Sequence, residues 1–312
     1  MPVRSIRIED LKSALKNGDT AGMDPARTWC AQLEAGDILY FPQTPVPIPA
    51  EDLHFLLGQQ QTGSKLHKNI AYKPNRDQLT GADATTATPG LVEQLHAVMR
   101  RYSASVAGFL TQFLAPYEQR WILDYASYRP LEEESRDLPA RRRNDLLHTD
   151  AFPTRPTRGR RILRFFHNIH PTRTRDWVVG PPFPRVVGAF VPGLLPVPRP
   201  DGALKRAGKR MAQATGLAKL IPQWKRTPYD EFMMRLHNAM KENAEFQRSC
   251  AKEHVQFPPG SSWMVYTETV PHAVLAGQYA LEQTFLVEAA AMVTPESAPV
   301  AILEKMAGAR LV

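Results

Sequence analysis

Three side chains of this sequence are of the types that bind a transition metal. His148 and Asp150 belong to the chain's single His-x-Asp triplet, which ends a predicted strand over residues 145–149. Side chains two apart on a strand project from the same face, so this imidazole and this carboxylate can chelate one cation. His272 follows a predicted strand over residues 263–267 and is the candidate third ligand. Two imidazoles and one carboxylate are typical of non-haem ferrous sites, in which the remaining coordination positions stay open.

The composition is that of an ordinary globular chain. The sequence has 312 residues, of which 43% are hydrophobic and 22% charged, and a chain of this size can bury a full core. Two cysteines, Cys30 and Cys250, are too few for a disulfide framework. No apolar stretch reaches the ~18 residues of a membrane span, and residues 1–10 lack the apolar segment of a secretory signal. We therefore expect a cytoplasmic protein.

Short strands bounded by proline and glycine dominate the predicted secondary structure. Helices are predicted over residues 8–16, 91–114 and 229–246, and Pro116 ends the second of them. Strands are predicted over residues 37–41, 121–128, 145–149, 162–169, 186–191, 263–267 and 280–287. The expected fold class is α+β, with many short strands in a jelly roll or barrel.

The net charge of +8 is concentrated in one segment. Residues 199–226 contain eight cations and one acid, so this segment alone carries +7. Apolar residues are interleaved with the cations, which is typical of a stretch that binds anionic membranes at roughly 1 kcal/mol per cation. Nucleic-acid phosphates, or a solvated surface with no partner, are the alternatives. The segment lies in a predicted helical insertion, about residues 192–252, within a single domain over residues 1–312.

The stretches around the candidate ligands carry a family resemblance. Residues 143–153, 161–171, 270–278 and 281–285 resemble the Kdo 3-hydroxylases. These are iron(II)/2-oxoglutarate-dependent dioxygenases that act on the 3-deoxy-octulosonate (Kdo) sugar of bacterial lipopolysaccharide. The resemblance implies a double-stranded β-helix (jelly-roll) core with flanking helices and a helical, basic insertion. It further implies Fe(II) held by the three candidate ligands, with 2-oxoglutarate and O2 as co-substrates. The implied reaction hydroxylates C3 of Kdo and converts 2-oxoglutarate to succinate and CO2.

The far carboxylate of 2-oxoglutarate requires a buried cation. Many relatives supply an arginine shortly after the distal histidine, but here residues 273–295 contain no cation. Arg164 lies in the apolar strand predicted over residues 162–169 and shares a face with Asn168. We therefore predict that Arg164 binds 2-oxoglutarate, with neutral hydrogen bonds from Asn168 and Gln283. The alternative is an Arg164 that faces solvent or pairs with a structural glutamate.

Three further residues are candidates for contact with the sugar. Arg129 and Arg143 lie on or beside the strands that lead to the triplet and can meet anionic groups, with plain surface charge as the alternative. Tyr125 is a candidate pocket residue or a core residue. The expected partners are Kdo-lipid A and the anionic inner-membrane surface, reached through residues 199–226 from the cytoplasmic side, and no nucleic acid is expected.

Two other kinds of protein remain open at this point. One is a basic, β-rich protein that binds membranes or nucleic acid without metal chemistry. The other is a cupin-type metalloenzyme that does not use 2-oxoglutarate. The first explains the charge equally well, but it leaves the chelating spacing of the histidines and the aspartate without a reason.

Overall fold

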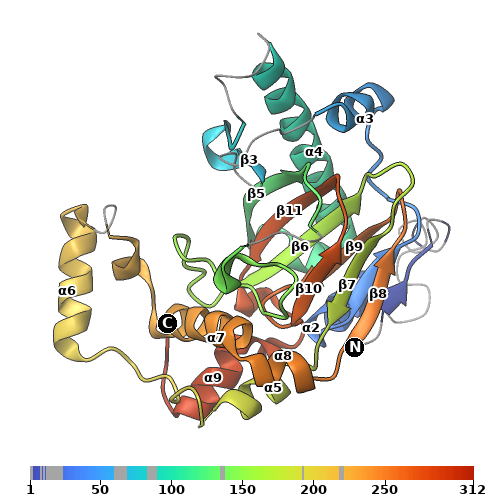
Figure 1. The fold of residues 1–312 in the computed structure, drawn as a ribbon. Helices are drawn as coiled ribbons and strands as arrows, with labels where there is room; N and C mark the ends of the chain where they lie inside the picture. The colour runs from blue at the N-terminus through green and yellow to red at the C-terminus, as the bar shows by residue number, and fades with distance from the viewer. Residues whose placement is uncertain are drawn as a thin grey trace.

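The computed structural model consists of two sheets with helices around them (Figure 1). The residues described in it are 3–7, 9, 11, 24–59, 69–82, 90–133, 138–191, 193–217 and 221–312. The helix predicted over residues 8–16 falls outside these residues except at positions 9 and 11. None of the helices in the described ranges is both long enough and apolar enough to cross a membrane.

The large sheet has eight strands in the order β1-β2-β9-β6-β11-β5-β3-β4. The pair β1–β2 is parallel, and the other neighbours are antiparallel. The strands are β1 (Val3–Ser5), β2 (Ile38–Phe41), β3 (Ile70–Lys73), β4 (Gln78–Thr80), β5 (Trp121–Arg129), β6 (Arg161–Asn168), β9 (Ser262–Tyr266) and β11 (Ala280–Val287). The small antiparallel sheet has the order β10-β7-β8, with β7 (Arg175–Val179), β8 (Glu253–Phe257) and β10 (His272–Ala276).

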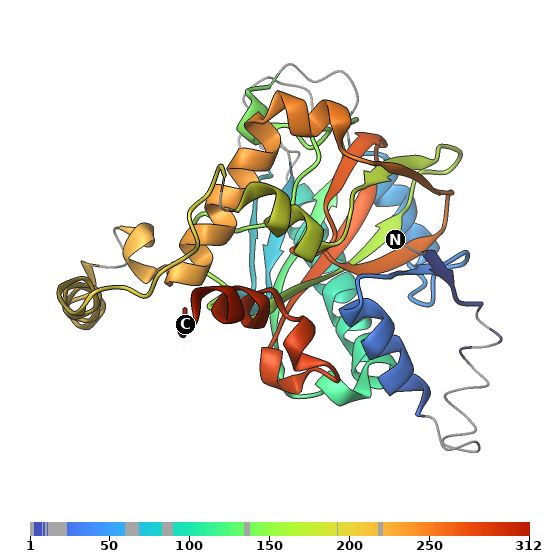
Figure 2. The ribbon, with the colours of Figure 1, turned by 90° about the horizontal axis from the view of Figure 1, so that it is seen from below.

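Helices cover the outer face of the large sheet and one end of the molecule (Figure 2). They are α2 (Pro25–Glu34), α3 (Ala50–Leu57), α4 (Leu91–Phe113), α5 (Phe183–Phe190), α6 (Ala203–Ala214), α7 (Pro228–Glu242), α8 (Ala244–Ser249) and α9 (Pro299–Ala307). Helices α2 and α4 pack on the large sheet, while α5, α7 and α9 share a second apolar cluster. The helix predicted over residues 91–114 is confirmed as α4.

Alternation along β6 decides which residues face the metal site. Leu163 and Phe165 belong to the core beneath α4. Phe166 faces the other way, between the two sheets, where it stacks on Trp263 and meets Trp177 edge-on. Because successive side chains of a strand point to opposite faces, Arg164 lies on the same side as Phe166, toward the small sheet.

Five of the predicted strands are confirmed, as β2, β5, β6, β9 and β11. The strand predicted over residues 145–149 is wrong, because only His148 makes a bridge there, with His272. The strand predicted over residues 186–191 is also wrong. Its apolar residues belong to α5, where Phe183, Val187 and Phe190 recur at helical spacing and are buried.

The helix predicted over residues 229–246 is present but divided. Helix α7 begins with a capping box, in which the side chains of Thr227 and Asp230 each accept a hydrogen bond from the other's backbone N–H. Asn243 then ends α7 and caps α8 by accepting from the N–H of Phe246. Between β7 and β8 the described chain forms α5 to α8 and no strand. The single domain over residues 1–312 and the insertion at about 192–252 stay predictions.

Candidate metal centre

The two ends of the predicted metal site are held together by backbone hydrogen bonds. The N–H of His148 donates to the carbonyl of His272 at 3.1 Å, and the reverse bond is 2.9 Å. The N–H of Asp150 donates to the carbonyl of Thr267 at 2.9 Å. Thr267 and the first residue of β10, His272, therefore fix both members of the triplet, and the possible ligand atoms of His148, Asp150 and His272 lie within 4.8 Å of one another.

Both imidazoles are oriented by the main chain. The Nδ1–H of His148 donates to the carbonyl of Leu146 at 2.7 Å, and that of His272 donates to the carbonyl of Val270 at 2.9 Å. Each bond fixes the tautomer in which Nε2 carries the free lone pair, as in most metal-binding histidines. Trp177 stacks on His272 with ring centroids 5.0 Å apart. The two rings therefore present Nε2 to a common point beside Asp150.

The protonation states also suit a divalent cation. Burial, together with the neighbouring His272, holds the pKa of His148 well below its usual value, and burial likewise lowers the pKa of His272. Burial works against ionisation of Asp150, but the Arg164 guanidinium and the two imidazoles keep the pKa of Asp150 below its ordinary value. Two neutral imidazoles and one carboxylate are the donors of the ferrous facial triad. The residues present therefore fit Fe(II).

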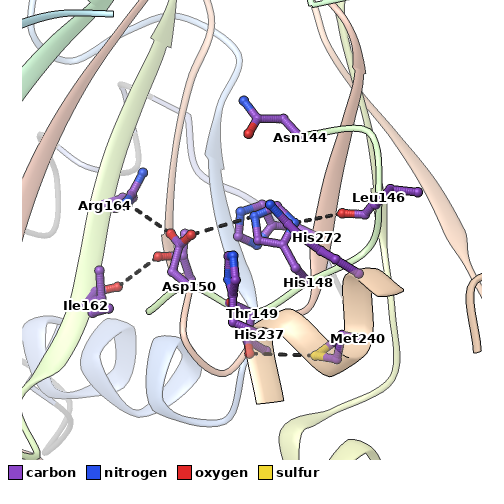
Figure 3. Close-up of polar contacts among 12 residues, drawn as sticks. Asn144, Leu146, His148, Thr149, Asp150, Ile162, Arg164, His237, Met240 and His272 are labelled. Carbon is purple, nitrogen blue, oxygen red and sulfur yellow. Dashed lines mark hydrogen bonds and ion pairs between the residues drawn. The ribbon is translucent and has the colours of Figure 1, made fainter. Parts of the chain in front are cut away.

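Arg164 lies beside the carboxylate of Asp150, on the side away from the two imidazoles (Figure 3). Its Nη2 is 3.1 Å from Oδ2 of Asp150, and its Nη1 is 2.7 Å from Oε1 of Glu282 on β11. The other oxygen of Glu282 accepts a hydrogen bond from Nε of Arg129 at 3.1 Å. These two guanidiniums outweigh burial and lower the pKa of Glu282. One glutamate thus joins two buried arginines at the edge of the metal site.

A cavity of about 40 Å³ opens in front of the three ligands. Three of its lining residues are arginines: Arg129, Arg164 and Arg175. Burial, followed by repulsion from Arg129, lowers the pKa of Arg175 to about 10. Within the described part of the chain, the Nε groups of Arg164 and Arg175 have no hydrogen-bond partner. The other lining residues are the three ligands with Asn144, Phe166, Trp177 and Val274.

Two of the residues predicted to bind 2-oxoglutarate do not line this cavity. The amide of Asn168 donates to the carbonyls of Arg173 and Phe257, both at 2.9 Å. Gln283 pairs with Phe165 across the sheet, so it lies on the face that packs against α4. Its amide donates to the carbonyl of Asp124 at 2.9 Å. The structure therefore does not place either amide where the sequence predicts it.

The predicted sugar-binding residues are divided between the cavity and its surroundings. Arg129 lines the cavity. Arg143 lies outside it and donates from Nε to Oδ1 of Asp145 at 3.0 Å. Tyr125 also lies outside it, with the Arg155 guanidinium 3.9 Å from its ring centre. Their roles toward a substrate stay predictions.

Several residues of the centre are not among those predicted from the sequence. Arg175 had a readable signal, because alternation places it on the same strand face as Trp177. His237 had none, because it reaches the site from α7, where its Nδ1–H donates to the carbonyl of Thr149 at 2.7 Å and its ring meets that of His148 edge-on. Glu282 lies in the stretch after His272 where relatives supply an arginine, and nothing in the sequence indicated that this acid would pair with Arg129 and Arg164.

Solved structures with this fold are known. A crystal structure of the Kdo hydroxylase KdoO with α-ketoglutarate (2-oxoglutarate) and Fe(III) matches over 100% of this chain and 98% of the other chain. The two are 31% identical, with a TM-score of 0.82. The KdoO complexes with succinate and Fe(III) and with cobalt(II) have the same coverage, 32% identity and TM-scores of 0.81 and 0.82. Those structures are of a non-heme Fe(II) α-ketoglutarate-dependent dioxygenase, and the fold and the centre described above place this chain in that class.

The family is narrower than the class. A sequence model of the 3-deoxy-D-manno-oct-2-ulosonic acid (Kdo) hydroxylases matches residues 17–310. The chain therefore belongs to the Kdo hydroxylase family, as the resemblance in its sequence implied. A search of curated proteins found no match.

Proposed function

We propose that this chain hydroxylates C3 of the Kdo sugar of lipid A and the lipopolysaccharide inner core. In this reaction one oxygen atom of O2 enters the sugar and the other enters succinate, while 2-oxoglutarate loses CO2. The observation that carries the proposal is the convergence of His148, Asp150 and His272 in a member of the Kdo hydroxylase family. That membership also sets aside a binding protein without metal chemistry and a cupin-type enzyme without 2-oxoglutarate.

The fold fits the same proposal. A double-stranded β-helix, or jelly roll, packs two sheets face to face with the metal ligands between them. Here Phe257 of the small sheet stacks on Trp263 of the large sheet, and Trp177 of the small sheet meets Phe166 of the large sheet edge-on. The ligands lie at the edge of this aromatic core, where Trp177 contacts His272.

The protein's part in the reaction is to bind the metal while leaving coordination positions free, and to keep water out of the site. A bound ferrous ion supplies the coordination positions at which 2-oxoglutarate and O2 react. His148, Asp150 and His272 would hold this ion, and before 2-oxoglutarate binds Nη2 of Arg164 pairs with Oδ2 of Asp150. Phe166 and Trp177 line the cavity, and their apolar surfaces exclude bulk water.

Arg164 is the proposed partner for the far carboxylate of 2-oxoglutarate, with Arg175 as a second cation. Both line the cavity, and each has a buried Nε–H without a partner among the described residues. At about 40 Å³, the cavity has room for roughly three water molecules. A five-carbon diacid needs more space, so its binding requires the Arg164 side chain to turn from Asp150 and Glu282 toward the ligand. Because 2-oxoglutarate carries two negative charges and Fe(II) two positive charges, binding of both leaves the net charge of the site unchanged.

The finer substrate contacts belong to the same proposal. Arg129 and Arg143 meet anionic groups of Kdo-lipid A, and Tyr125 contacts the acceptor. Support comes from Arg129 and from Asn144, the neighbour of Arg143, because both line the cavity. Because the acceptor is a lipid, the enzyme works from the cytoplasm as a peripheral protein of the inner membrane. There, residues 199–226 face anionic lipid.

The test is the product itself. The purified protein is incubated with Fe(II), 2-oxoglutarate and Kdo-lipid A, and succinate and the mass of the Kdo sugar are measured. We expect one succinate for each Kdo that gains one oxygen atom, with the new hydroxyl at C3 by NMR. Succinate formation that Kdo-lipid A does not stimulate, or a hydroxyl on the acyl chains, would contradict the proposed substrate.

A further inference from the structure

A segment that we call the arm, residues 193–217 and 221–226, extends away from the sheets between α5 and α7 (Figures 1 and 2). It holds six of the nine large hydrophobic side chains that are exposed in the described part of the chain. These are Leu194, Leu204, Met211, Leu217, Ile221 and Trp224. Scattered exposed apolar residues are ordinary, but a group of them on one element marks an interaction surface.

Helix α6 of the arm is turned with its charged face toward the protein. Lys205 Nζ lies 3.1 Å from Oε2 of Glu231 on α7. Lys209 Nζ donates to Oδ2 of Asp201 at 2.7 Å and to the carbonyl of Arg226 at 2.6 Å. These contacts fix the rotation of the helix about its axis.

The apolar face of α6 consequently points outward. Leu204 and Met211 lie on this face at helical spacing, and they are 91% and 68% exposed. A surface helix of a complete globular protein has the opposite orientation, with its apolar stripe on the core and its charges in water. The arrangement of α6 is therefore favourable only when an apolar partner covers Leu204 and Met211.

The charge around this face identifies the partner. Arg206 and Arg210 lie on the polar side of α6, next to Lys205 and Lys209, and form no ion pair with any described residue. At the base of the arm, Arg199 and Arg235 line a cavity of about 510 Å³ and have no ion pair within the described ranges either. Two copies of a segment with a net charge of +7 repel each other, and a nucleic acid offers no apolar surface for Leu204. An anionic lipid surface offers both the apolar and the anionic contact.

We infer that the arm docks the protein on an anionic membrane, with Leu204 and Met211 among the acyl chains and Arg206 and Arg210 on the lipid phosphates. The arm is also joined to the metal centre. Arg226 donates to the carbonyl of Pro153, three residues after the ligand Asp150. The inference rests on the proposed function in one respect: a lipid substrate gives the protein a reason to bind a membrane.

The experiment measures co-sedimentation of the full chain with vesicles. The vesicles contain phosphatidylethanolamine and phosphatidylglycerol, or phosphatidylcholine alone. We expect binding to the anionic vesicles that falls with salt. The Leu204→Ser/Met211→Ser and Arg206→Glu/Arg210→Glu variants each reduce this binding by roughly tenfold or more. These residues are exposed, so the variants keep the thermal stability of the unmodified protein.

Matched controls place the same changes elsewhere on the surface. Ile122→Ser/Met306→Ser removes two exposed apolar side chains outside the arm, and Arg27→Glu/Arg76→Glu reverses two exposed charges. We expect both controls to bind the anionic vesicles like the unmodified protein. Equal binding of the Leu204→Ser/Met211→Ser variant, or equal binding to phosphatidylcholine, would overturn the inference. The inference would also be overturned if the unmodified protein formed a dimer in the absence of lipid and the Leu204→Ser/Met211→Ser variant were a monomer.

The outcome is separable from that of the proposed function. The arm variants should still form succinate with a soluble Kdo acceptor, since none of the changed residues lines the metal site. If the protein binds anionic vesicles through the arm but forms no succinate, the proposed reaction is contradicted and the docking of the arm on a membrane is confirmed.

Discussion

The metal centre and the arm use charged and apolar side chains in opposite ways. In the centre, the side chains of Arg129 and Arg164 are each only 11% exposed and share Glu282, and aromatic rings of Phe166 and Trp177 line the same cavity. In the arm, Arg206 and Arg210 are exposed and unpaired within the described structure, and Leu204 points into solvent. A buried charge is tolerated only with its partner in place, whereas an exposed one is free to meet a partner from outside.

The comparison separates two kinds of preorganisation. The three metal-binding residues are positioned before any ligand arrives, because backbone hydrogen bonds join His148 to His272 and Asp150 to Thr267. The arm, in contrast, needs another surface to cover its exposed apolar side chains. Its internal contacts fix the orientation of α6 and leave the apolar face open.

The largest effect on stability should come from a charge in the interior. Arg161 is fully buried, donates from Nη2 to Thr269 at 3.1 Å, and pairs with Glu268. Arg161→Met leaves Glu268 buried without its cation and should lower the free energy of unfolding by about 3–5 kcal/mol. The matched Arg206→Met change in the arm should alter it by less than about 0.5 kcal/mol. Urea denaturation measures both values, and similar losses would remove the contrast between the two regions.

A smaller effect is expected within the centre, at Arg164. Arg164→Lys keeps the charge but loses the planar donor fork, so the KM for 2-oxoglutarate should rise roughly tenfold. The affinity for Fe(II) should be unchanged, and the control Arg142→Lys, at an exposed arginine outside the cavity, should leave this KM unchanged. Steady-state succinate formation and metal titration give the two quantities. A loss of Fe(II) affinity at constant KM would show instead that Arg164 acts by positioning Asp150.

The metal ligands could be predicted from the sequence because residue type and spacing are local information. His148 and Asp150 are two apart, and an extended backbone brings such a pair to one face even though the segment forms only a single bridge rather than a strand. The β-branched residues of 186–191 favour a strand in isolation. They form α5 because Phe183, Val187 and Phe190 reach a shared apolar cluster only on one helical face.

The network around the ligands could not be predicted in the same way. Glu282 meets Arg129 and Arg164 through the pairing of three strands that lie far apart in the sequence. Gln283 follows Glu282 directly, and the alternation of β11 turns it to the opposite face. A shift of one residue in register would exchange the two, and the sequence does not contain that register.

The most direct test of the metal centre is Fe(II)-dependent turnover of 2-oxoglutarate by variants of each ligand. We predict that His148→Ala, Asp150→Ala and His272→Ala each lower succinate formation and Fe(II) affinity by roughly a hundredfold or more. The control His54→Ala, at an exposed histidine of α3, should retain both. Turnover at the unmodified level in any one of the three ligand variants would contradict the assignment of the centre.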